Sequence, residues 1–407
     1  MKIKNIQDVV LPMAGSAVSV VFVSGVTGQD GSHMVDYLLK NVPNTFIIGG
    51  ARRLSVDNHQ NIDHLSNEQR FQLVNFDLTD SHSIYKLMEH AKPDYFINFA
   101  AQSFVASSWD FARQTWQTNS TSILDCLEAI KRLKPECRFY NAGSSEEFGN
   151  VLFSPQNETH PPHPRSPYGA SKAAARTLIK VYRESYGLYA VQGWLFNHEG
   201  TRRGEQFVTR KITKGVARIK KAIDLFNKGV EGISPRELKF DPIELGNINA
   251  LRDWSDAEDM VDAVWRMLNQ EKFACVPWAV NQPTEDFQYA VWHKFVVNRI
   301  KDYVVSSDEN HSIREFITEA FSVAGIDGMW FINMKNDPLS EHFVYVDGGI
   351  PVPDLELVKI NPRFYRPAEV EILKGDSSAI RNDLGWNPQS NFKSLVKKMV
   401  ENDLTHT

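Results

Sequence analysis

An apolar run of β-branched residues leads directly into a glycine-rich loop near the start of the chain. Val18 to Ser24 predicts a buried strand, the loop Gly25-Val26-Thr27-Gly28-Gln29-Asp30-Gly31 follows without a break, and a helical pattern is under way by His33. Such a loop lets backbone approach a pyrophosphate closely, and the helix N-terminus directs its amide dipoles at the charge. This order predicts the first unit of a Rossmann-type fold that binds a dinucleotide.

Apolar runs and helical patterns continue to alternate through the first half of the chain. The further predicted elements are strands at Phe46 to Gly50, Phe71 to Asp77, Tyr95 to Ala100 and Cys137 to Asn141, and helices at Ser83 to His90 and Asn119 to Leu133. Strand, helix and strand at this spacing indicate right-handed βαβ units. We therefore expect an α/β fold, a Rossmann-type doubly wound parallel sheet with a smaller C-terminal substrate-binding lobe.

The pattern changes after about Leu195, where proline, glycine and charged residues divide the chain into shorter elements. Helices are predicted near Lys211 to Lys228, Ala257 to Leu268 and Ile313 to Ala324. We predict an N-terminal extension at residues 1–19, a nucleotide-binding Rossmann domain at 20–195 and a substrate-binding lobe over most of 196–407. Residues from about 245 to 270 are expected to return to the Rossmann domain.

Composition and charge exclude several classes of protein. The 407 residues carry a net charge of -5 and show no basic run, which argues against nucleic acid as a partner. No stretch of about 18 or more uncharged apolar residues occurs, so we expect no membrane span. The run Val9 to Val23 could be misread as a signal peptide, but Asp8 interrupts its basic flank and the run continues into the glycine loop.

Three cysteines, Cys126, Cys137 and Cys275, have no paired spacing. They predict reduced thiols in a cytoplasmic protein and no metal site.

Two arginines follow the second predicted strand in the stretch Gly49-Gly50-Ala51-Arg52-Arg53. An acidic residue at this point would bind a free ribose 2′-hydroxyl, whereas paired guanidiniums suit a 2′-phosphate. Solvated surface arginines are the alternative. Asp77 and Leu78, just after the third strand, fall where an adenine ring is commonly held. The sequence therefore favours NADP as the cofactor.

A tyrosine and a lysine lie one helical turn apart in Tyr168-Gly169-Ala170-Ser171-Lys172. This spacing puts a phenol and an ammonium on the same face of a helix. The ammonium favours phenolate over phenol, so Tyr168 can take the hydroxyl proton of an alcohol whose carbon gives hydride to the cofactor. The spacing also occurs by chance, but a phosphate-binding loop lies upstream in the same predicted fold.

Gly143-Ser144-Ser145-Glu146 follows the strand Cys137 to Asn141, at the sheet edge where ligands of such folds bind. Ser144 can hydrogen-bond the hydroxyl that Tyr168 deprotonates. Glu146 supplies a second acid/base, which a simple dehydrogenase does not need. After oxidation of a sugar at C4, a carboxylate can remove the C5 proton and help the C6 hydroxyl leave as water. This is a 4,6-dehydration; a solvated or structural glutamate is the alternative.

The chain resembles the GDP-mannose 4,6-dehydratases of the extended short-chain dehydrogenase/reductase superfamily. The stretches that carry the resemblance are GVTGQDGSH from Gly25, ARR from Ala51, DLTD from Asp77, AAQSFV from Ala100, SSE from Ser144, PRSPYGASK from Pro164, LFNHEGTRRG from Leu195, FVTRKI from Phe207, LGNINALRDW from Leu245 and YRPAEV from Tyr365. The NHE, VTRKI and RPAEV stretches are the most specific to this branch.

The resemblance implies a lyase that converts GDP-mannose to GDP-4-keto-6-deoxymannose. It gives as catalytic residues Ser144, Glu146, Tyr168 and Lys172. It gives as NADP-binding residues Gly25, Thr27, Gly28, Gln29, Asp30, Gly31, Arg52, Arg53, Asp77, Leu78, Ala100, Gln102, Tyr168, Lys172 and His198. It gives as substrate-binding residues Ser103, Asn197, Arg210, Lys211, Gly246, Arg252, Arg366 and Glu369. The basic members suit a diphosphate, and Glu369 suits a guanine N–H edge.

The family's loop after the paired arginines reaches a neighbouring subunit, so a homo-dimer or homo-tetramer is expected. The chain departs from the family pattern at Phe148, where a tyrosine is usual, and in the longer segments 220–243, 273–301 and 333–360. These segments are either surface additions or parts that reshape the sugar pocket. The alternatives for function are a dehydratase of another GDP-sugar such as a GDP-heptose, a related sugar-nucleotide reductase or decarboxylase, and a non-catalytic NADP-binding regulator.

Overall fold

The described part of the chain divides into two compact units. The structure is a computed structural model, and it describes residues 1–13, 15–56, 58–229, 238–270, 300–332, 338–364 and 372–407. Unit 1 comprises Met1–Phe196, Ala257–Ser306 and Gly375–Pro388; unit 2 comprises Asn197–Asp256, Ser307–Lys374 and Gln389–Thr407. The chain returns to unit 1 at Ala257, so residues 245–256 of the segment expected to return lie in unit 2.

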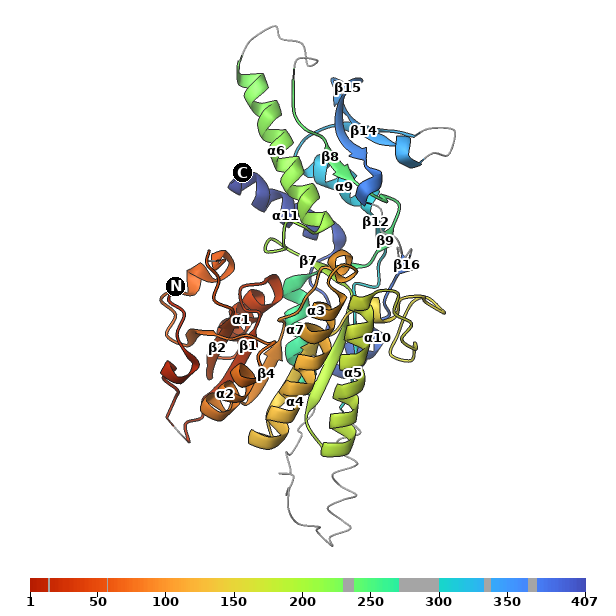
Figure 1. The fold of residues 1–407 in the computed structure, drawn as a ribbon. Coiled ribbons are helices and arrows are strands. Elements are labelled where there is room, and N and C mark those ends of the chain that lie inside the picture. The colour runs from red at the N-terminus through yellow and green to blue at the C-terminus, as the bar shows by residue number, and fades with distance from the viewer. Residues whose placement is uncertain (14, 57, 230–237, 271–299, 333–337, 365–371) are drawn as a thin grey trace. The chain divides into compact units, whose positions relative to one another are not determined.

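A seven-stranded sheet forms the centre of unit 1 (Figure 1). Its strands are β1 (Ser19–Ser24), β2 (Thr45–Ala51), β3 (Phe71–Asn75), β4 (Tyr95–Asn98), β5 (Arg138–Ala142), β6 (Ala190–Leu195) and β11 (Val304–Val305). They lie in the order β11-β6-β5-β4-β1-β2-β3, and all neighbours pair in parallel. This is the order of a doubly wound sheet whose winding reverses beside β1. The α/β prediction is confirmed.

Helices cover both faces of this sheet. They are α1 (Gln29–Asn41), α2 (Ser81–Ala91), α3 (Ala112–Trp116), α4 (Ser122–Leu133), α5 (Pro167–Tyr186), α7 (Ala257–Leu268) and α10 (Ser378–Leu384). Val21 and Val23 of β1 pack in the core with α1 and α7, whereas Phe22 packs in the opposite core with α2, α4 and α5. Because both faces are buried, the strands appear in the sequence as nearly continuous apolar runs.

The N-terminal residues also pack on unit 1. Lys4 forms a parallel bridge to Val74, and its Nζ donates to Gln72 Oε1 at 2.8 Å. Ile6 and Val9 are buried in the core that contains α2. This segment therefore extends the β3 edge of the sheet.

Local capping signals fix both ends of α5. Ser166 Oγ accepts from the Gly169 N–H at 3.0 Å, and Pro167 occupies the first turn, where no amide donor is required. Gly187 ends the helix with a φ of +68°, a conformation that favours glycine. Tyr168 and Lys172 consequently fall in the first two turns of a well-defined helix. Figure 1 shows α4 and α5 side by side along the sheet.

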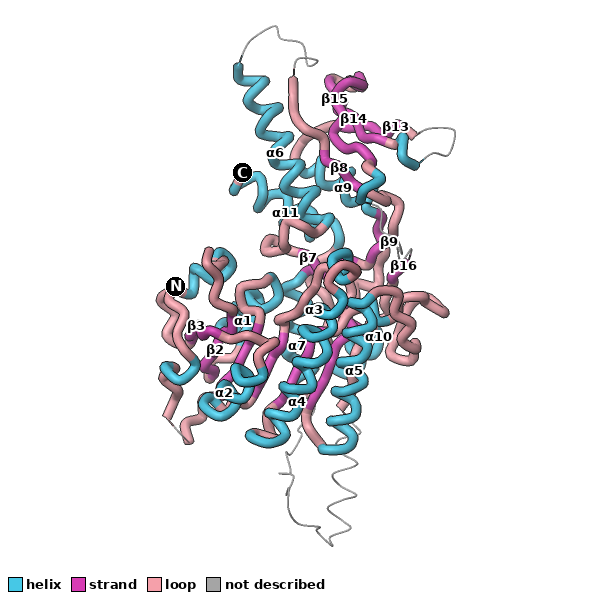
Figure 2. The backbone as a smooth tube through the Cα atoms, in the orientation of Figure 1, coloured by secondary structure: helices cyan, strands magenta, loops and turns pink. Residues whose placement is uncertain are grey.

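Unit 2 has a separate core of three helices packed on short strands. Its elements are β7 (Asn197–Glu199), α6 (Val208–Gly229), β8 (Ile243–Leu245), β9 (Leu251–Arg252), β10 (Trp254–Asp256), β12 (His311–Ser312), α9 (Ile313–Val323), β13 (Gly328–Phe331), β14 (His342–Asp347), β15 (Ile350–Ile360), β16 (Ile372–Leu373) and α11 (Phe392–His406). Trp254, Phe316 and Phe392 pack together in this core. Figure 2 shows β14 and β15 as the hairpin that the pairing register defines.

Among the helices that the structure describes, none has both the length and the apolar character that a membrane span requires.

Candidate functional site

The glycine loop between β1 and α1 has the backbone geometry of an anion site. Gly25 has a φ of +67°, and a Cβ there would lie 2.7 Å from the Ala100 nitrogen. A Cβ on Gly31 would lie 2.4 Å from the Gly25 carbonyl oxygen. No side chain caps α1 at Gly28, so the helix N-terminus is suited to an anionic ligand. The loop therefore fits the diphosphate of a dinucleotide.

The arginines predicted to select NADP follow β2 and are exposed. The Arg53 N–H donates to Asn75 Oδ1 at 3.1 Å, which ties the start of this segment to the end of β3. Asn61 Nδ2 donates to the Thr27 carbonyl at 2.9 Å, so the segment also contacts the glycine loop. Arg52 and Arg53 directly follow β2, which pairs with β1 in the sheet, and guanidiniums are suited to a ribose phosphate.

Gln102 is held by an asparagine that the sequence analysis missed. Its N–H donates to Asn119 Oδ1 at 2.9 Å, and Asn119 Nδ2 donates to the Gln102 carbonyl at 3.0 Å and to Ser171 Oγ at 3.2 Å. Asn119 lies in a π-helical turn (Gln117–Thr121) where a continuous α-helix was expected. Such turns are frequent at functional sites, but a single asparagine in a helical pattern gives no sequence signal.

Tyr168 and Lys172 are both buried in α5, with 7% and 3% of their surfaces exposed. Lys172 Nζ donates to the Ala142 carbonyl at the end of β5, at 2.7 Å, and lies 5.8 Å from the centroid of the Tyr168 ring. Burial lowers the pKa of Lys172 to about 8, while the charges of Glu147 and Asp30 act in the opposite direction. The side chain can therefore carry its charge at neutral pH.

The turn with Ser144 and Glu146 lies against the start of α5. Ser144 Oγ accepts from the Glu146 N–H at 3.2 Å, within a 3-10 turn, η5 (Ser145–Glu147). A Cβ on Gly169 would lie 2.5 Å from the Glu146 carbonyl oxygen, so glycine permits this close approach. The structure thus brings the four predicted catalytic residues into two adjacent elements, beyond the carboxyl end of β5.

Two further charged residues next to this turn were missed by the sequence analysis. Glu147 is fully buried and pairs with Arg176 of α5, with 2.6 Å between Oε2 and Nε. The available signals were a second glutamate directly after Glu146 and an arginine one turn beyond Lys172. Phe148, the departure from the family pattern, is also buried and stacks on Trp194 at 5.7 Å.

Of the remaining predicted residues that the structure describes, Asp77, Leu78 and Ser103 lie in unit 1, and the others lie in unit 2. Asn197 and His198 belong to β7, which pairs with β10, and Gly246 follows β8. Arg252 of β9 is only 7% exposed, and Lys211 Nζ lies 3.7 Å from the centroid of the Phe364 ring.

Arg210 pairs with Asp403 of α11 at 2.9 Å, and its side chain is 11% exposed. Arg210 therefore forms a buried ion pair within unit 2, which the sequence analysis did not predict. Ser103 is exposed in unit 1, and Arg366 and Glu369 lie outside the described residues.

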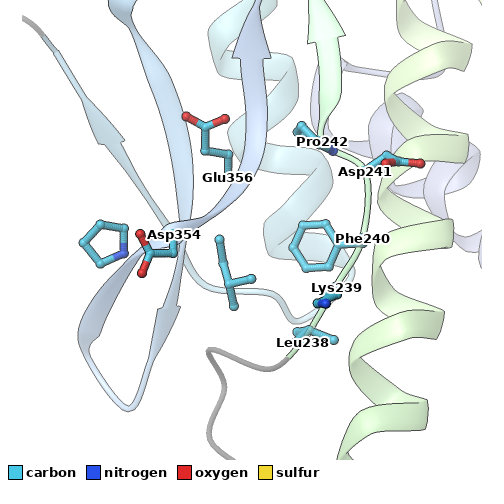
Figure 3. Close-up of a pocket in the computed structure, with 9 residues that line it drawn as sticks. Leu238, Lys239, Phe240, Asp241, Pro242, Asp354 and Glu356 are labelled. Carbon is cyan, nitrogen blue, oxygen red and sulfur yellow. The ribbon is translucent and has the colours of Figure 1, made fainter.

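Two of the long segments meet in unit 2 around a hollow of about 730 Å³ (Figure 3). Residues 238–242 line one side, and residues 353–356 of β15 line the other. The parallel pairing of β15 with β8 brings these segments together. The lining contains none of the predicted site residues, so the hollow is a feature of the additions rather than part of the predicted site.

A buried Tyr-Lys pair on a helix of a doubly wound sheet, followed by a second unit, defines the extended short-chain dehydrogenases. Within that class the chain belongs to the GDP-mannose 4,6-dehydratase family, because the family model described as GDP-mannose 4,6 dehydratase matches residues 22–284 and 281–399. The family resemblance inferred from the sequence is confirmed.

Individual proteins agree with this membership. GDP-mannose 4,6 dehydratase 1 of Arabidopsis thaliana is 38% identical over 95% of this chain and 90% of its own length. GDP-mannose 4,6-dehydratase of Vibrio cholerae serotype O1 is 36% identical over 95% and 93%. The solved structure of RMD from Pseudomonas aeruginosa complexed with NADPH has a TM-score of 0.66 at 21% identity, and covers 96% of this chain and 100% of that chain.

Proposed function

We propose that this protein is a GDP-mannose 4,6-dehydratase, a hydro-lyase that converts GDP-mannose to GDP-4-keto-6-deoxymannose with bound NADP. The observation that carries the proposal is the close packing of η5 on α5 at Gly169. This packing brings the turn that carries Glu146 against the helix that carries Tyr168 and Lys172. The reaction needs one base for a hydroxyl and another for a carbon-bound proton.

In this mechanism Tyr168 takes the proton of the sugar C4 hydroxyl, and Ser144 hydrogen-bonds the same oxygen. The Lys172 ammonium stabilises the phenolate form of Tyr168 through its positive charge. NADP, when bound in the glycine loop, supplies the reversible hydride acceptor that an internal oxidation and reduction requires. Arg52 and Arg53 hold its ribose phosphate.

Glu146 removes the C5 proton once C4 is a ketone. The same carboxyl group then gives its proton to the C6 hydroxyl, which leaves as water. Return of the hydride from C4 to C6, and of the proton taken by Tyr168 to C5, gives the 4-keto-6-deoxy product. Glu146 is half-buried, so it can reach a bound sugar and still exchange protons. Lys211 and Arg252 of unit 2 carry positive charge, which suits the diphosphate of the substrate.

We also propose a cytoplasmic enzyme that forms a homo-dimer or homo-tetramer. Cys126 and Cys137 are buried free thiols, as suits a reducing compartment. The oligomeric proposal rests on the family's loop after the paired arginines, and light scattering on the purified protein tests it.

The first experiment is mass spectrometry of GDP-mannose after incubation with the purified protein and NADP, without a reductant. Loss of one water with the nucleotide intact is the expected result. An unchanged mass from folded, NADP-bound protein would contradict GDP-mannose as the substrate, and GDP-heptoses would be tested next. Stoichiometric consumption of NADPH would instead indicate a reductase.

A further inference from the structure

A buried ion pair next to the active-site turn is not used by the mechanism above. Glu147 Oε2 accepts from Arg176 Nε at 2.6 Å. Arg176 Nη1 also donates to the Gln192 carbonyl at 2.7 Å, and its guanidinium lies 3.3 Å from the centroid of the Trp194 ring. Desolvating two charges is costly unless their geometry and hydrogen bonds are well satisfied. Arg176 meets this condition, because it is bonded to Glu147 and to the Gln192 carbonyl and stacks on Trp194.

The Glu147 carboxylate is bonded to the turn itself. Its Oε1 accepts from the Ser144 N–H at 2.9 Å. The Ser144 side chain completes the capping box at the N-terminal end of η5. A Cβ on Gly143 would lie 2.8 Å from this same oxygen, so the backbone packs tightly around the carboxylate. The backbone position of Ser144 therefore depends on Glu147.

The same carboxylate is connected to the helix with Lys172. Gln192 Nε2 donates both to Glu147 Oε1 and to the Lys172 carbonyl, each at 3.0 Å. Arg176 extends from the next turn of that helix to the other carboxylate oxygen. The Glu147 carboxylate therefore contacts α5 through Arg176 and η5 through the Ser144 N–H.

Few charged groups face Lys172 in the part of the chain that the structure describes. The phenol of Tyr168 lies near Lys172 on the same helix, and the carboxylates that act on its charge include Glu147 from η5 and Asp30 from the start of α1. Burial lowers the pKa of Lys172, and the carboxylate of Glu147 is the first of the two charges that raise it. Arg176 in turn faces Asp302, whose carboxylate lies 3.4 Å away.

We propose that Glu147 and Arg176 are positioning residues of the active site. Their ion pair joins the Ser144–Glu146 turn to α5, and the Glu147 carboxylate supplies a negative charge for the buried ammonium of Lys172. Neither residue touches substrate. The inference rests on the proposed function, because it assumes that the turn and the helix carry the catalytic groups.

Three variants test the two parts of this inference. Glu147→Gln keeps an oxygen acceptor for the Ser144 N–H and removes the charge. Glu147→Leu/Arg176→Met removes both charges and the bonds to the turn, so no unpaired charge stays buried. Glu128→Gln is the control, because Glu128 is also a paired carboxylate but contacts Lys131, Arg132 and Tyr182 instead.

The first measurement is the titration of Lys172 in the protein without cofactor, by NMR of ε-¹³C-labelled lysine assigned with Lys172→Arg. The midpoint is expected to fall by about one pH unit in Glu147→Gln and to stay in place in Glu128→Gln. It should fall by less in the double variant, because that variant also removes the positive charge of Arg176. The alkaline limb of the kcat profile should move in the same direction. A midpoint unchanged in the variants that lack Glu147 would overturn the electrostatic part, and the double variant decides this if Glu147→Gln does not fold.

The second measurement is the kcat and KM of the double variant for GDP-mannose at its best pH. A displaced turn should lower kcat by at least about tenfold with KM nearly unchanged. Wild-type kcat would overturn the positioning part. If the wild-type protein does not dehydrate GDP-mannose, the proposed function fails, whereas the Lys172 titration still tests this inference.

Discussion

Two adjacent glutamates in the active-site turn differ in their surroundings and therefore in what they can do. Glu147 is fully buried and bonded to Arg176, the Ser144 N–H and Gln192. Glu146 is half-buried and has no part in that ion pair. A general acid/base must reach the proton that it transfers. Glu146 therefore suits the role of general acid/base, and Glu147 suits the role of a positioning residue.

Replacement of Glu146 tests this assignment. Glu146→Gln should lower kcat by about a hundredfold or more, because it removes the group that takes the C5 proton. Glu136→Gln, an exposed glutamate after α4, serves as the matched control and should keep full activity. Turnover is followed by loss of water from GDP-mannose, and a fall of well under tenfold in Glu146→Gln would contradict the role.

The lowered pKa of the buried Lys172 predicts how the free energy of unfolding depends on pH. Burial lowers its pKa from 10.5 to about 8, so between these values the unfolded chain holds a proton that the folded protein has released. Stability therefore rises with pH through this window. From pH 8 to 9.5 the wild-type protein should gain about 1.5 kcal/mol relative to Lys172→Met, measured by urea unfolding. A difference that stays constant would argue against a depressed pKa.

At the scale of elements, Gly169 permits the close approach of α5 to the active-site turn. Gly169→Ala adds a methyl group only 2.5 Å from the Glu146 carbonyl oxygen, so the turn or the helix must move. A displacement of this kind should lower kcat by about tenfold to a hundredfold. Steady-state kinetics and the urea midpoint are measured together, and wild-type kcat would show that the contact does not position the turn.

The N-cap of α5 gives a separate prediction for stability. Ser166→Ala removes the acceptor of the Gly169 N–H and should lower the free energy of unfolding by about 1 kcal/mol. Ser185→Ala, exposed in the last turn of the same helix, should change it little. Equal effects of the two substitutions on the urea midpoint would contradict the capping role.

At the scale of the whole molecule, the described residues form separate cores in the two units. Phe316→Ala removes a ring that packs on Trp254 and Phe392 in unit 2, and should cost about 3–5 kcal/mol there. Hydrogen exchange should accelerate in α6, α9 and α11 while α1, α4 and α5 keep their protection. Uniform acceleration across both units would show that they unfold as one.

Fold and site were predictable from the sequence to different degrees. The alternation of apolar runs and helices predicted five strands of the main sheet, β1 to β5, since residues buried on both faces leave a continuous pattern. It did not predict β6 or β11. It also did not predict the return of Gly375–Pro388 to unit 1, which depends on long-range packing, or the π-helical turn at Asn119, because such a turn lies within an ordinary helical pattern. The residues that support Gln102 and Ser144 were missed for the same reasons.

The sequence by itself determined the glycine loop, the Tyr168–Lys172 spacing and the family, because each depends on residue type at short range. Only the tertiary structure decided that Glu147 and Arg176 form an ion pair, since they are distant in sequence and meet through the packing of η5 on α5. Tertiary packing likewise paired Arg210 with Asp403 and brought two long segments together around a hollow. Burial and contacts between distant residues determine the charge state and the position of these side chains. The pattern of residues along the chain does not show which distant residues meet.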